Sequence, residues 1–329
     1  MSDLETAPDL LTCNPEAPHA EVEVLSPREV PLGGLRAMPV RRTLPQRQRS
    51  LIGAWCFLDH YGPDDVDVTG GMVVAPHPHT GLQTVSWLFE GEIEHRDSTG
   101  AHAMVRPGEV NLMTAGQGIA HSEVSTTGTT TLHGAQLWVA LPDSARHTDP
   151  GFQHYAPTPF DVDGARITVF LGSLAGDTSP VLTFTPLLGA EITIDPGTTL
   201  PLDVDATFEH GVLVDDGAVT LHGTRLDRAE LGYLTPGHAV LRLVNHTAQP
   251  ARILLLGGPP FGEAILMWWN FVGRSNDEII RFREQWQHEI ATLYKGAADV
   301  APQFGLVPGY VGGPIPAPTL PSVPIKPRR

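Results

Sequence analysis

Short runs of apolar or alternating residues recur along most of the chain, and turn signals rich in glycine, proline and aspartate separate them. Successive side chains of a strand point to opposite faces, so runs of this kind are typical of half-buried strands. Their short and fairly regular spacing predicts an all-β sandwich or barrel. The clearest runs are VSWLFEG (85–91), VNLMTAG (110–116), GAQLWVAL (134–141), ITVFLG (167–172), VLVDDG (212–217) and ARILLLGG (251–258).

This pattern contains an approximate internal repeat. A strand ending in Glu-Gly at 90–91 leads to RPGEVNLMTAG, and a strand ending in Asp-Gly at 216–217 leads in the same way to RAELGYLTPG. Two similar β units fit the length, because 329 residues exceed one ordinary domain. We therefore expect an arm (1–20), an N-terminal domain (21–150), a linker (151–164), a C-terminal domain (165–262), a helical segment (263–295) and a Pro-rich tail (296–329).

One amphipathic helix is predicted near the end of the chain. Ser275 and Glu278 form the signature of a capping box, and apolar residues then recur at three- or four-residue spacing. The helix should cover about 276–294 and pack its apolar stripe on a domain. The tail after it is expected to be extended and solvated, with binding to a proline-reading domain as the alternative. The stripe comprises Ile279, Phe282, Trp286, Ile290 and Leu293.

Composition narrows the class of protein. Apolar residues make up 41% of the chain, enough for a folded core, and the net charge of −16 argues against nucleic acid or an anionic membrane as the main partner. Two cysteines, Cys13 and Cys56, cannot form a disulfide framework, and Cys56 is expected to be a buried apolar filler. The acidic, proline-containing N-terminus does not resemble a signal peptide, and no apolar run is long enough to span a bilayer. We therefore expect a cytoplasmic protein.

Four residues carry the candidate chemistry. His77 and His79 are two residues apart, as are His121 and Glu123, so each pair shares one face of an extended strand. The prolines on both sides of His77 remove backbone donors, which predicts an irregular or edge strand. A strand–hairpin–strand excursion of 42 residues from His79 to His121 would return the second pair beside the first inside a barrel.

Three imidazoles and one carboxylate suit a single borderline divalent ion such as Fe(II), Mn, Co, Ni, Cu or Zn. On an octahedral metal this set leaves two neighbouring positions open, as an oxygenase needs for a substrate oxygen and for dioxygen. A four-coordinate zinc would instead close the site and make it structural. The spacing alone leaves both interpretations open.

Two motifs in this region resemble those of the cupins: a G-x5-H-x-H run that ends at His79 and a G-x-G-x2-H run that ends at His121. The pirin family is resembled by two segments, PHPHTGLQTVSWLFEGEIEHRDSTG and MTAGQGIAHSE. A looser similarity extends from RRTLPQRQRSLIGAWCFLDHYGP to GGPPFGEAILMWWNFVGRS. The resemblance implies two cupin (jelly-roll β-barrel) domains in tandem with a C-terminal amphipathic helix. The first cupin would bind one metal, with Fe(II) favoured, through His77, His79, His121 and Glu123, and the second would be degenerate.

The same resemblance implies a dioxygenase of the quercetinase type. Its substrates would be dioxygen and a small aromatic molecule, flavonol-like or otherwise enolizable, and Glu123 would act as the catalytic base. An alternative is a non-enzymatic, metal-dependent regulatory or redox-sensing protein that binds a protein partner. A structural zinc bicupin is a third interpretation. Gln83 stands where cupins often carry a glutamate, which pirins do not use as a ligand.

Several other residues are candidates for positions near the site. His95 and His102 lie in or beside a charged hairpin, EHRDSTGAHAM (94–104), and are expected in exposed turns, with a place at the pocket mouth as the alternative for His95. His133 is expected in the core or behind a ligand. Asp59 and His60 fit either a turn or a supporting position. The histidines of the second unit have neither H-x-H nor H-x-E spacing and so predict no second metal site; they are His210, His222, His238 and His246.

Overall fold

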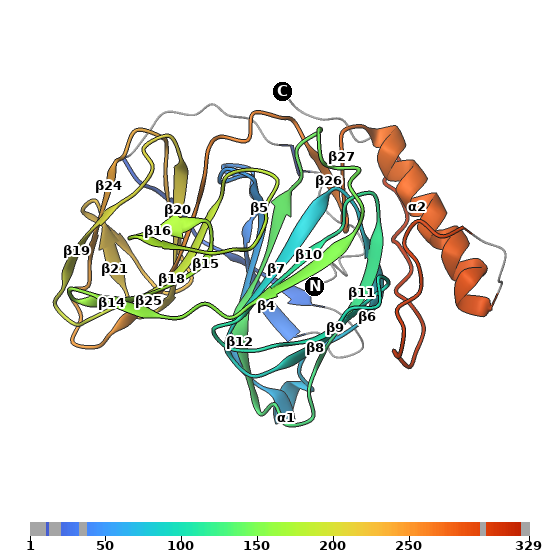
Figure 1. Ribbon diagram of the computed structural model, residues 1–329, viewed down its shortest axis with the longest axis horizontal. Coiled ribbons are helices and arrows are strands. Elements are labelled where there is room, and N and C mark those ends of the chain that lie inside the picture. The colour runs from blue at the N-terminus through green and yellow to red at the C-terminus, as the bar shows by residue number, and fades with distance from the viewer. Residues whose placement is uncertain (1–10, 13–20, 33–37, 297–300, 324–329) are drawn as a thin grey trace.

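The computed structural model describes residues 11–12, 21–32, 38–296 and 301–323. Two β-barrels lie side by side, and a helix flanks the N-terminal barrel on the side away from the C-terminal one (Figure 1). The predicted all-β class with a late helix is confirmed. Of the expected arm only Leu11 and Thr12 are described, and Cys13 lies outside the described residues. No helix in the described part of the chain is long and apolar enough to cross a membrane.

Two antiparallel sheets form the N-terminal barrel. In spatial order, the seven-stranded sheet contains β13 (Gly151–Tyr155), β10 (Val110–Thr114), β7 (Leu82–Glu90), β12 (Thr131–Ala140), β5 (Trp55–Asp65), β4 (Met38–Leu44) and β3 (Arg28–Leu32). The four-stranded sheet contains β6 (Val73–His79), β11 (Ile119–Ser125), β8 (Ile93–Asp97) and β9 (His102–Val105). A one-turn helix, α1 (Val66–Thr69), follows β5.

The C-terminal barrel has the same division into sheets of seven and four strands, as the internal repeat suggests. Its larger sheet contains β14 (Phe160–Val162), β15 (Ala165–Leu171), β18 (Leu188–Ile194), β25 (Ala251–Gly258), β20 (Glu209–Asp216), β23 (Leu231–Leu234) and β2 (Glu23–Leu25). The smaller sheet contains β19 (Thr199–Asp203), β24 (Val240–Val244), β21 (Val219–Leu221) and β22 (Thr224–Leu226), and β16 (Ser173–Leu174) pairs with β17 (Asp177–Thr178). Aliphatic side chains fill the core of this barrel.

The strand pairing differs from the expected domain boundaries in two places. β2, from the segment assigned to the first domain, pairs with β23 of the C-terminal barrel. In the expected linker, β13 pairs with β10 of the first barrel and β14 with β15 of the second. An exposed sheet edge presents unpaired N–H and C=O groups. The connecting segments pair with such edges and so become edge strands of the two larger sheets. Cross-barrel apolar contacts are supplied by Trp87, Leu137, Phe170 and Leu254, among others.

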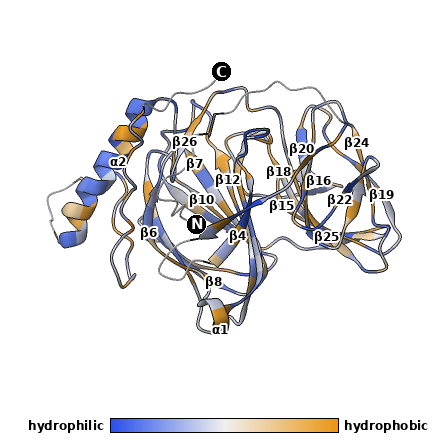
Figure 2. Ribbon diagram, turned by 180° about the vertical axis from the view of Figure 1, so that it is seen from behind, coloured by the Kyte–Doolittle hydropathy of each residue, from blue (hydrophilic) through white to orange (hydrophobic). Residues whose placement is uncertain are grey.

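The predicted helix is present as α2 (Asn276–Ala291), followed by a 3₁₀ turn at Leu293–Lys295. Ser275 is the N-cap, and its side chain accepts a hydrogen bond from the backbone N–H of Glu278. Hydrophobic residues are interspersed among hydrophilic ones along α2 (Figure 2), and the buried ones pack on the sheet of β1 (Leu11–Thr12), β26 (Leu266–Trp268) and β27 (Phe271–Gly273).

The segment expected as a solvated tail is instead docked on the protein over its described part. Phe304, Val307 and Ala317 are buried in the same apolar cluster as Trp286 of α2. The expectation failed because proline content predicts an extended backbone but not exposure: an extended chain with spaced apolar residues can still lie in a groove. The described part of this segment returns to the N-terminal barrel beside β6 and β11.

Candidate metal centre

The two H-x-H and H-x-E segments lie on neighbouring strands, as their spacing predicts. β6 carries His77 and His79, β11 carries His121 and Glu123, and His121 is the direct register partner of His77. β6 is the edge strand of its sheet, and its register with β11 shifts between His121 and Glu123. Both features agree with the prolines of β6, which cannot donate to a ladder.

Three imidazoles converge inside the barrel wall. The Nε2 atoms of His79 and His121 lie 3.0 Å apart, and the ring centroids of His77 and His121 are separated by 4.3 Å. One nitrogen from each of the three rings lies within 4.8 Å of the others. All three side chains are fully buried. The three histidines are therefore close enough to share one ion.

Glu123 lies at the side of this group. Its carboxylate forms a second group with His95 and His121, again with ligand atoms within 4.8 Å of one another. Ser86 Oγ lies 3.4 Å from Glu123 Oε1 and 2.8 Å from Gln136 Oε1, and its one hydroxyl proton can be donated to either acceptor. His121 is thus common to the three-histidine group and to the group that contains Glu123.

The tautomers of two rings follow from their partners. Nδ1 of His77 lies 2.9 Å from the carbonyl oxygen of Ala75, so it carries the proton, and the buried Nε2 has no hydrogen-bond partner. Nδ1 of His121 lies 3.4 Å from Nδ1 of His95, whose Nε2 lies 3.2 Å from Asp97 Oδ2. If Nε2 of His95 donates to the carboxylate of Asp97, Nδ1 of His95 accepts the proton on Nδ1 of His121. Nε2 of His121 then keeps its lone pair.

His95 was expected in an exposed turn, and that expectation is wrong: it is 3% exposed. β8 continues the sheet beside β11, and His95 is the register partner of Glu123. Burial tends to raise the pKa of Asp97, but hydrogen bonds from His95 and Thr99 outweigh this effect and hold it below its usual range. A carboxylate–imidazole–imidazole chain of this kind would hold the ring of His121 in one orientation for a metal. The H-R-D sequence at 95–97 could have indicated the contact between His95 and Asp97, because residues two apart share one face of a strand.

Electrostatics favour neutral, lone-pair-bearing rings. Burial lowers the pKa of His77, His79 and His121 well below the usual imidazole value, and the other imidazoles nearby lower it further. Neutral imidazoles are the ligand form that a metal requires. The donor set, with an unpartnered buried Nε2 on His77, fits a borderline divalent ion.

Sequence reasoning missed Tyr61, a fully buried residue of β5. Burial, and next the charge of Glu123, raise the pKa of its hydroxyl well above the usual value. A Cβ at Gly134 would lie 2.9 Å from this hydroxyl, so glycine there leaves room for it. The alternation along β5, with Phe57 and Asp59 on the same face as Tyr61, was the signal that could have identified it.

Gln83 has no part in this group. Its amide donates to Thr114 Oγ1 over 3.0 Å, and strand alternation places it on the face of β7 opposite Ser86 and Glu123. Asp59 forms a buried two-bond ion pair with Arg42, at 2.7 and 2.9 Å. Cys56 is buried, as expected.

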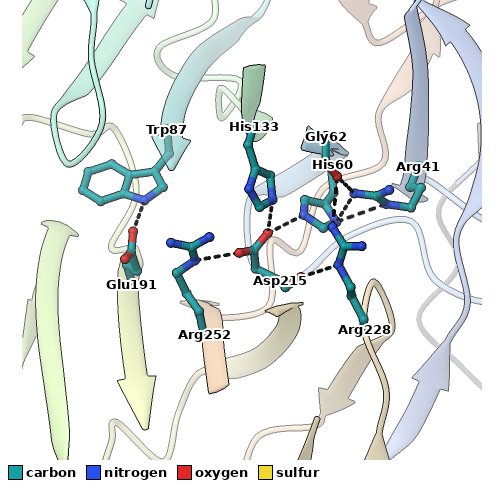
Figure 3. A network of polar contacts seen from close by, with 9 residues as sticks. All are labelled: Arg41, His60, Gly62, Trp87, His133, Glu191, Asp215, Arg228 and Arg252. Carbon is teal, nitrogen blue, oxygen red and sulfur yellow. Dashed lines mark hydrogen bonds and ion pairs between the residues drawn. The ribbon is translucent and has the colours of Figure 1, made fainter. Parts of the chain in front are cut away.

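A second histidine cluster lies between the barrels (Figure 3). Nε2 of His60 and Nε2 of His133 lie 2.7 and 2.6 Å from the same oxygen, Oδ1 of Asp215, and Arg252 donates to its other oxygen over 2.6 Å. Arg41 Nε donates to Nδ1 of His60 over 3.4 Å. His60 must therefore carry its proton on Nε2 and cannot offer that lone pair to a metal. The cluster joins the domains by hydrogen bonds.

A third group lies near the surface of the C-terminal barrel. Nδ1 of His222 lies 3.2 Å from Glu21 Oε1, and His238 is adjacent. The backbone N–H of Arg242 donates to Nε2 of His222 over 3.4 Å, so Nδ1 carries the proton that faces Glu21. In this arrangement neither nitrogen of His222 has a lone pair to offer an ion. His210 is fully buried, and its neighbour His238 adds to the effect of burial in lowering its pKa.

Comparison with known proteins decides the family. The pirin family model matches residues 37–139, and the model of the pirin C-terminal cupin domain matches residues 189–290. This chain belongs to the pirin family. A Pseudomonas aeruginosa protein named "Putative quercetin 2,3-dioxygenase" is 42% identical over 311 residues, covering 94% of this chain and 98% of that protein. The predicted resemblance to pirins is confirmed.

A solved structure and a second relative agree with this assignment. The crystal structure of a quercetin 2,3-dioxygenase from Acinetobacter baumannii superposes with a TM-score of 0.84 at 39% identity, covering 93% of this chain and 98% of that one. A pirin-like protein of Caulobacter vibrioides is 36% identical over 258 residues, covering 75% of this chain and 88% of that protein. The pirin fold therefore accounts for both barrels of this chain.

Proposed function

We propose that this pirin is a metal-dependent dioxygenase of the quercetinase type. His77, His79, His121 and Glu123 would hold one divalent transition metal, with Fe(II) favoured and Mn, Co, Ni, Cu or Zn as alternatives. The observation that carries the proposal is the convergence of three buried imidazoles, with Nε2 of His79 and His121 3.0 Å apart. The likeness to proteins named as quercetin 2,3-dioxygenases supports the substrate class.

A metal bound here would supply Lewis acidity to a substrate hydroxyl and a site for dioxygen. The residues around it supply the rest of the chemistry. The carboxylate of Glu123, which Ser86 contacts at Oε1, would accept the proton that leaves the substrate hydroxyl. His95 and Asp97 would hold the ring of His121 in one orientation and tautomer. The burial of these side chains would keep bulk water from the deprotonated substrate.

The test is metal analysis of protein purified from its own host, followed by oxygen-uptake measurements with that metal and a panel of flavonols that includes quercetin. We expect about one metal per chain and uptake that depends on the flavonol. The H77A variant, as a control, should lose both. Bound metal without uptake on any flavonol would contradict the dioxygenase assignment, and absence of metal from folded protein would contradict the site.

A further inference from the structure

The strand that carries His77 and His79 is poorly held by its own sheet. β6 is an edge strand, so β11 is its single ladder partner in that sheet. Pro76 and Pro78 lack the N–H groups with which a strand normally bonds. Two contacts from outside the sheet compensate: the carbonyl oxygen of Pro76 accepts from the backbone N–H of Ile315 over 2.8 Å, and that of Thr80 accepts from the N–H of Val272 over 3.0 Å. Both histidines lie between these points.

Ile315 belongs to the segment 301–320, which we call the C-terminal strap. The strap also contacts β11 immediately before His121, since the backbone N–H of Ala120 donates to the carbonyl oxygen of Phe304 over 3.0 Å. Gln303 Nε2 donates to the carbonyl oxygen of Gln117, in the turn that leads into β11, over 2.7 Å. The strap therefore contacts both ligand-bearing strands, each one residue from a candidate ligand.

A buried carboxylate fastens the strap to α2. Glu289 is fully buried, and its two oxygens accept from three successive backbone N–H groups of the strap: Gln303 at 2.7 Å, Phe304 at 3.2 Å and Gly305 at 2.9 Å. A buried carboxylate costs free energy unless it is fully hydrogen-bonded, and successive N–H groups form a strong anion-binding nest. Glu289 is therefore placed to order the strap.

Further along the strap, other side chains of α2 continue the attachment. Gln287 Oε1 accepts from the backbone N–H of Ala317 over 2.9 Å, and Trp286 Nε1 donates to the carbonyl oxygen of Ile315 over 2.8 Å. Arg283 Nε donates to the carbonyl oxygen of Pro318 over 2.6 Å. The Trp286 contact joins α2 to the same residue, Ile315, whose N–H bonds to β6. The strap begins after residue 290, where the matched pirin domains end.

We propose that the C-terminal strap is a brace for the metal centre and that Glu289 is a positioning residue for the ligands. By ordering the strap, Glu289 holds Pro76 of β6 and Ala120 of β11, and so sets the separation between His77 and His121. The inference rests on the proposed metal site. Loosening the strap should let β6 move at its edge, so the ligands lose preorganisation and the protein binds metal more weakly.

The test compares E289Q with E284Q in the full chain. Both changes remove one charge from α2, but Glu284 is exposed and Glu289 is buried. Cobalt(II) affinity is measured by competition with a chelator, and hydrogen exchange is followed over residues 117–122 and 303–305. We expect E289Q to bind cobalt about tenfold more weakly, at the lower end of losses for groups that orient ligands, with faster exchange in both segments. E284Q should match the wild type.

Several outcomes would overturn the brace. Unchanged cobalt affinity in E289Q would do so, whether or not exchange in the strap increases. If E289Q does not fold, Q287A replaces it: this half-buried residue gives the strap one hydrogen bond, so we expect a smaller but measurable loss of affinity, and an unchanged affinity overturns the inference. A wild type that binds no cobalt would instead contradict the proposed metal site, a failure that is visible before any variant is made.

Discussion

Nδ1 of His95 lies 3.4 Å from Nδ1 of His121, and the far side of the His95 ring meets Asp97. This contact joins a histidine of the charged hairpin to a candidate metal ligand across two neighbouring strands. It gives the centre an orienting chain that the H-x-H and H-x-E spacing does not contain.

Removing this chain should weaken metal binding without removing a ligand. We expect H95L to bind metal 10- to 100-fold more weakly than the wild type, the usual loss when a group that orients a ligand is deleted. H102L is the matched control, because His102 lies on the partner strand of the same hairpin and its side chain is 47% exposed. Chelator competition measures both. Equal affinities in the two variants would refute the role of His95.

The role of Glu123 as a base can be separated from its role as a ligand. E123Q keeps a carbonyl oxygen for the metal but cannot accept a proton, so we expect metal to remain bound while flavonol-dependent oxygen uptake falls by about 10²–10⁴. E94Q, on the adjacent strand β8, serves as the control. Metal content and uptake are measured on the same samples. Full uptake by metal-loaded E123Q would rule out the base.

The close packing between Gly134 and its neighbours, which include Tyr61, predicts that a larger residue at position 134 lowers stability. At Gly134 a Cβ would lie 2.7 Å from the carbonyl oxygen of Trp87 and 2.6 Å from Leu88 Cδ2, so G134A should lower the free energy of unfolding by about 1–3 kcal/mol. At Gly151 a Cβ would meet nothing within 4 Å. G151A should therefore leave stability within about 0.5 kcal/mol of the wild type. Urea unfolding distinguishes the two, and similar losses would contradict the packing argument.

The histidine cluster between the barrels predicts a pH dependence of stability. Burial lowers the pKa of His60 from 6.5 to about 4, against the opposing hydrogen bond to Asp215. Because the folded pKa is depressed, the unfolded chain binds this proton first. The contribution of neutral His60 to the free energy of unfolding is therefore complete above pH 6.5. It is lost as the pH falls toward 4, a decrease on the order of 3 kcal/mol.

The H60Q variant tests this sign. Its amide can still donate to Asp215 but does not titrate, so its stability should fall less steeply than that of the wild type between pH 6.5 and 4. His210, whose pKa burial also lowers to about 4, is present in both proteins and cancels in the difference. Chemical unfolding at a series of pH values provides the measurement. Parallel pH profiles would show that His60 does not titrate as its burial implies.

The sequence alone determined the features that depend on local spacing. Residues two apart share a strand face, so the paired positions of His77 with His79 and of His121 with Glu123 were predictable, as were the edge character of a strand with two prolines and the capped helix after Ser275. The motif resemblance led to the correct family and to two barrels.

Only the tertiary structure decided which distant groups meet these residues. His95 became buried because its strand pairs with β11, and Asp215 of the second barrel reached His60 of the first because two sheets pack face to face. The proline-rich strap is docked because α2 presents it with the buried carboxylate of Glu289 and an apolar surface that includes Trp286. The physical reason is that spacing sets which way a side chain points, whereas its partners depend on how the barrels close and which edges remain to be covered.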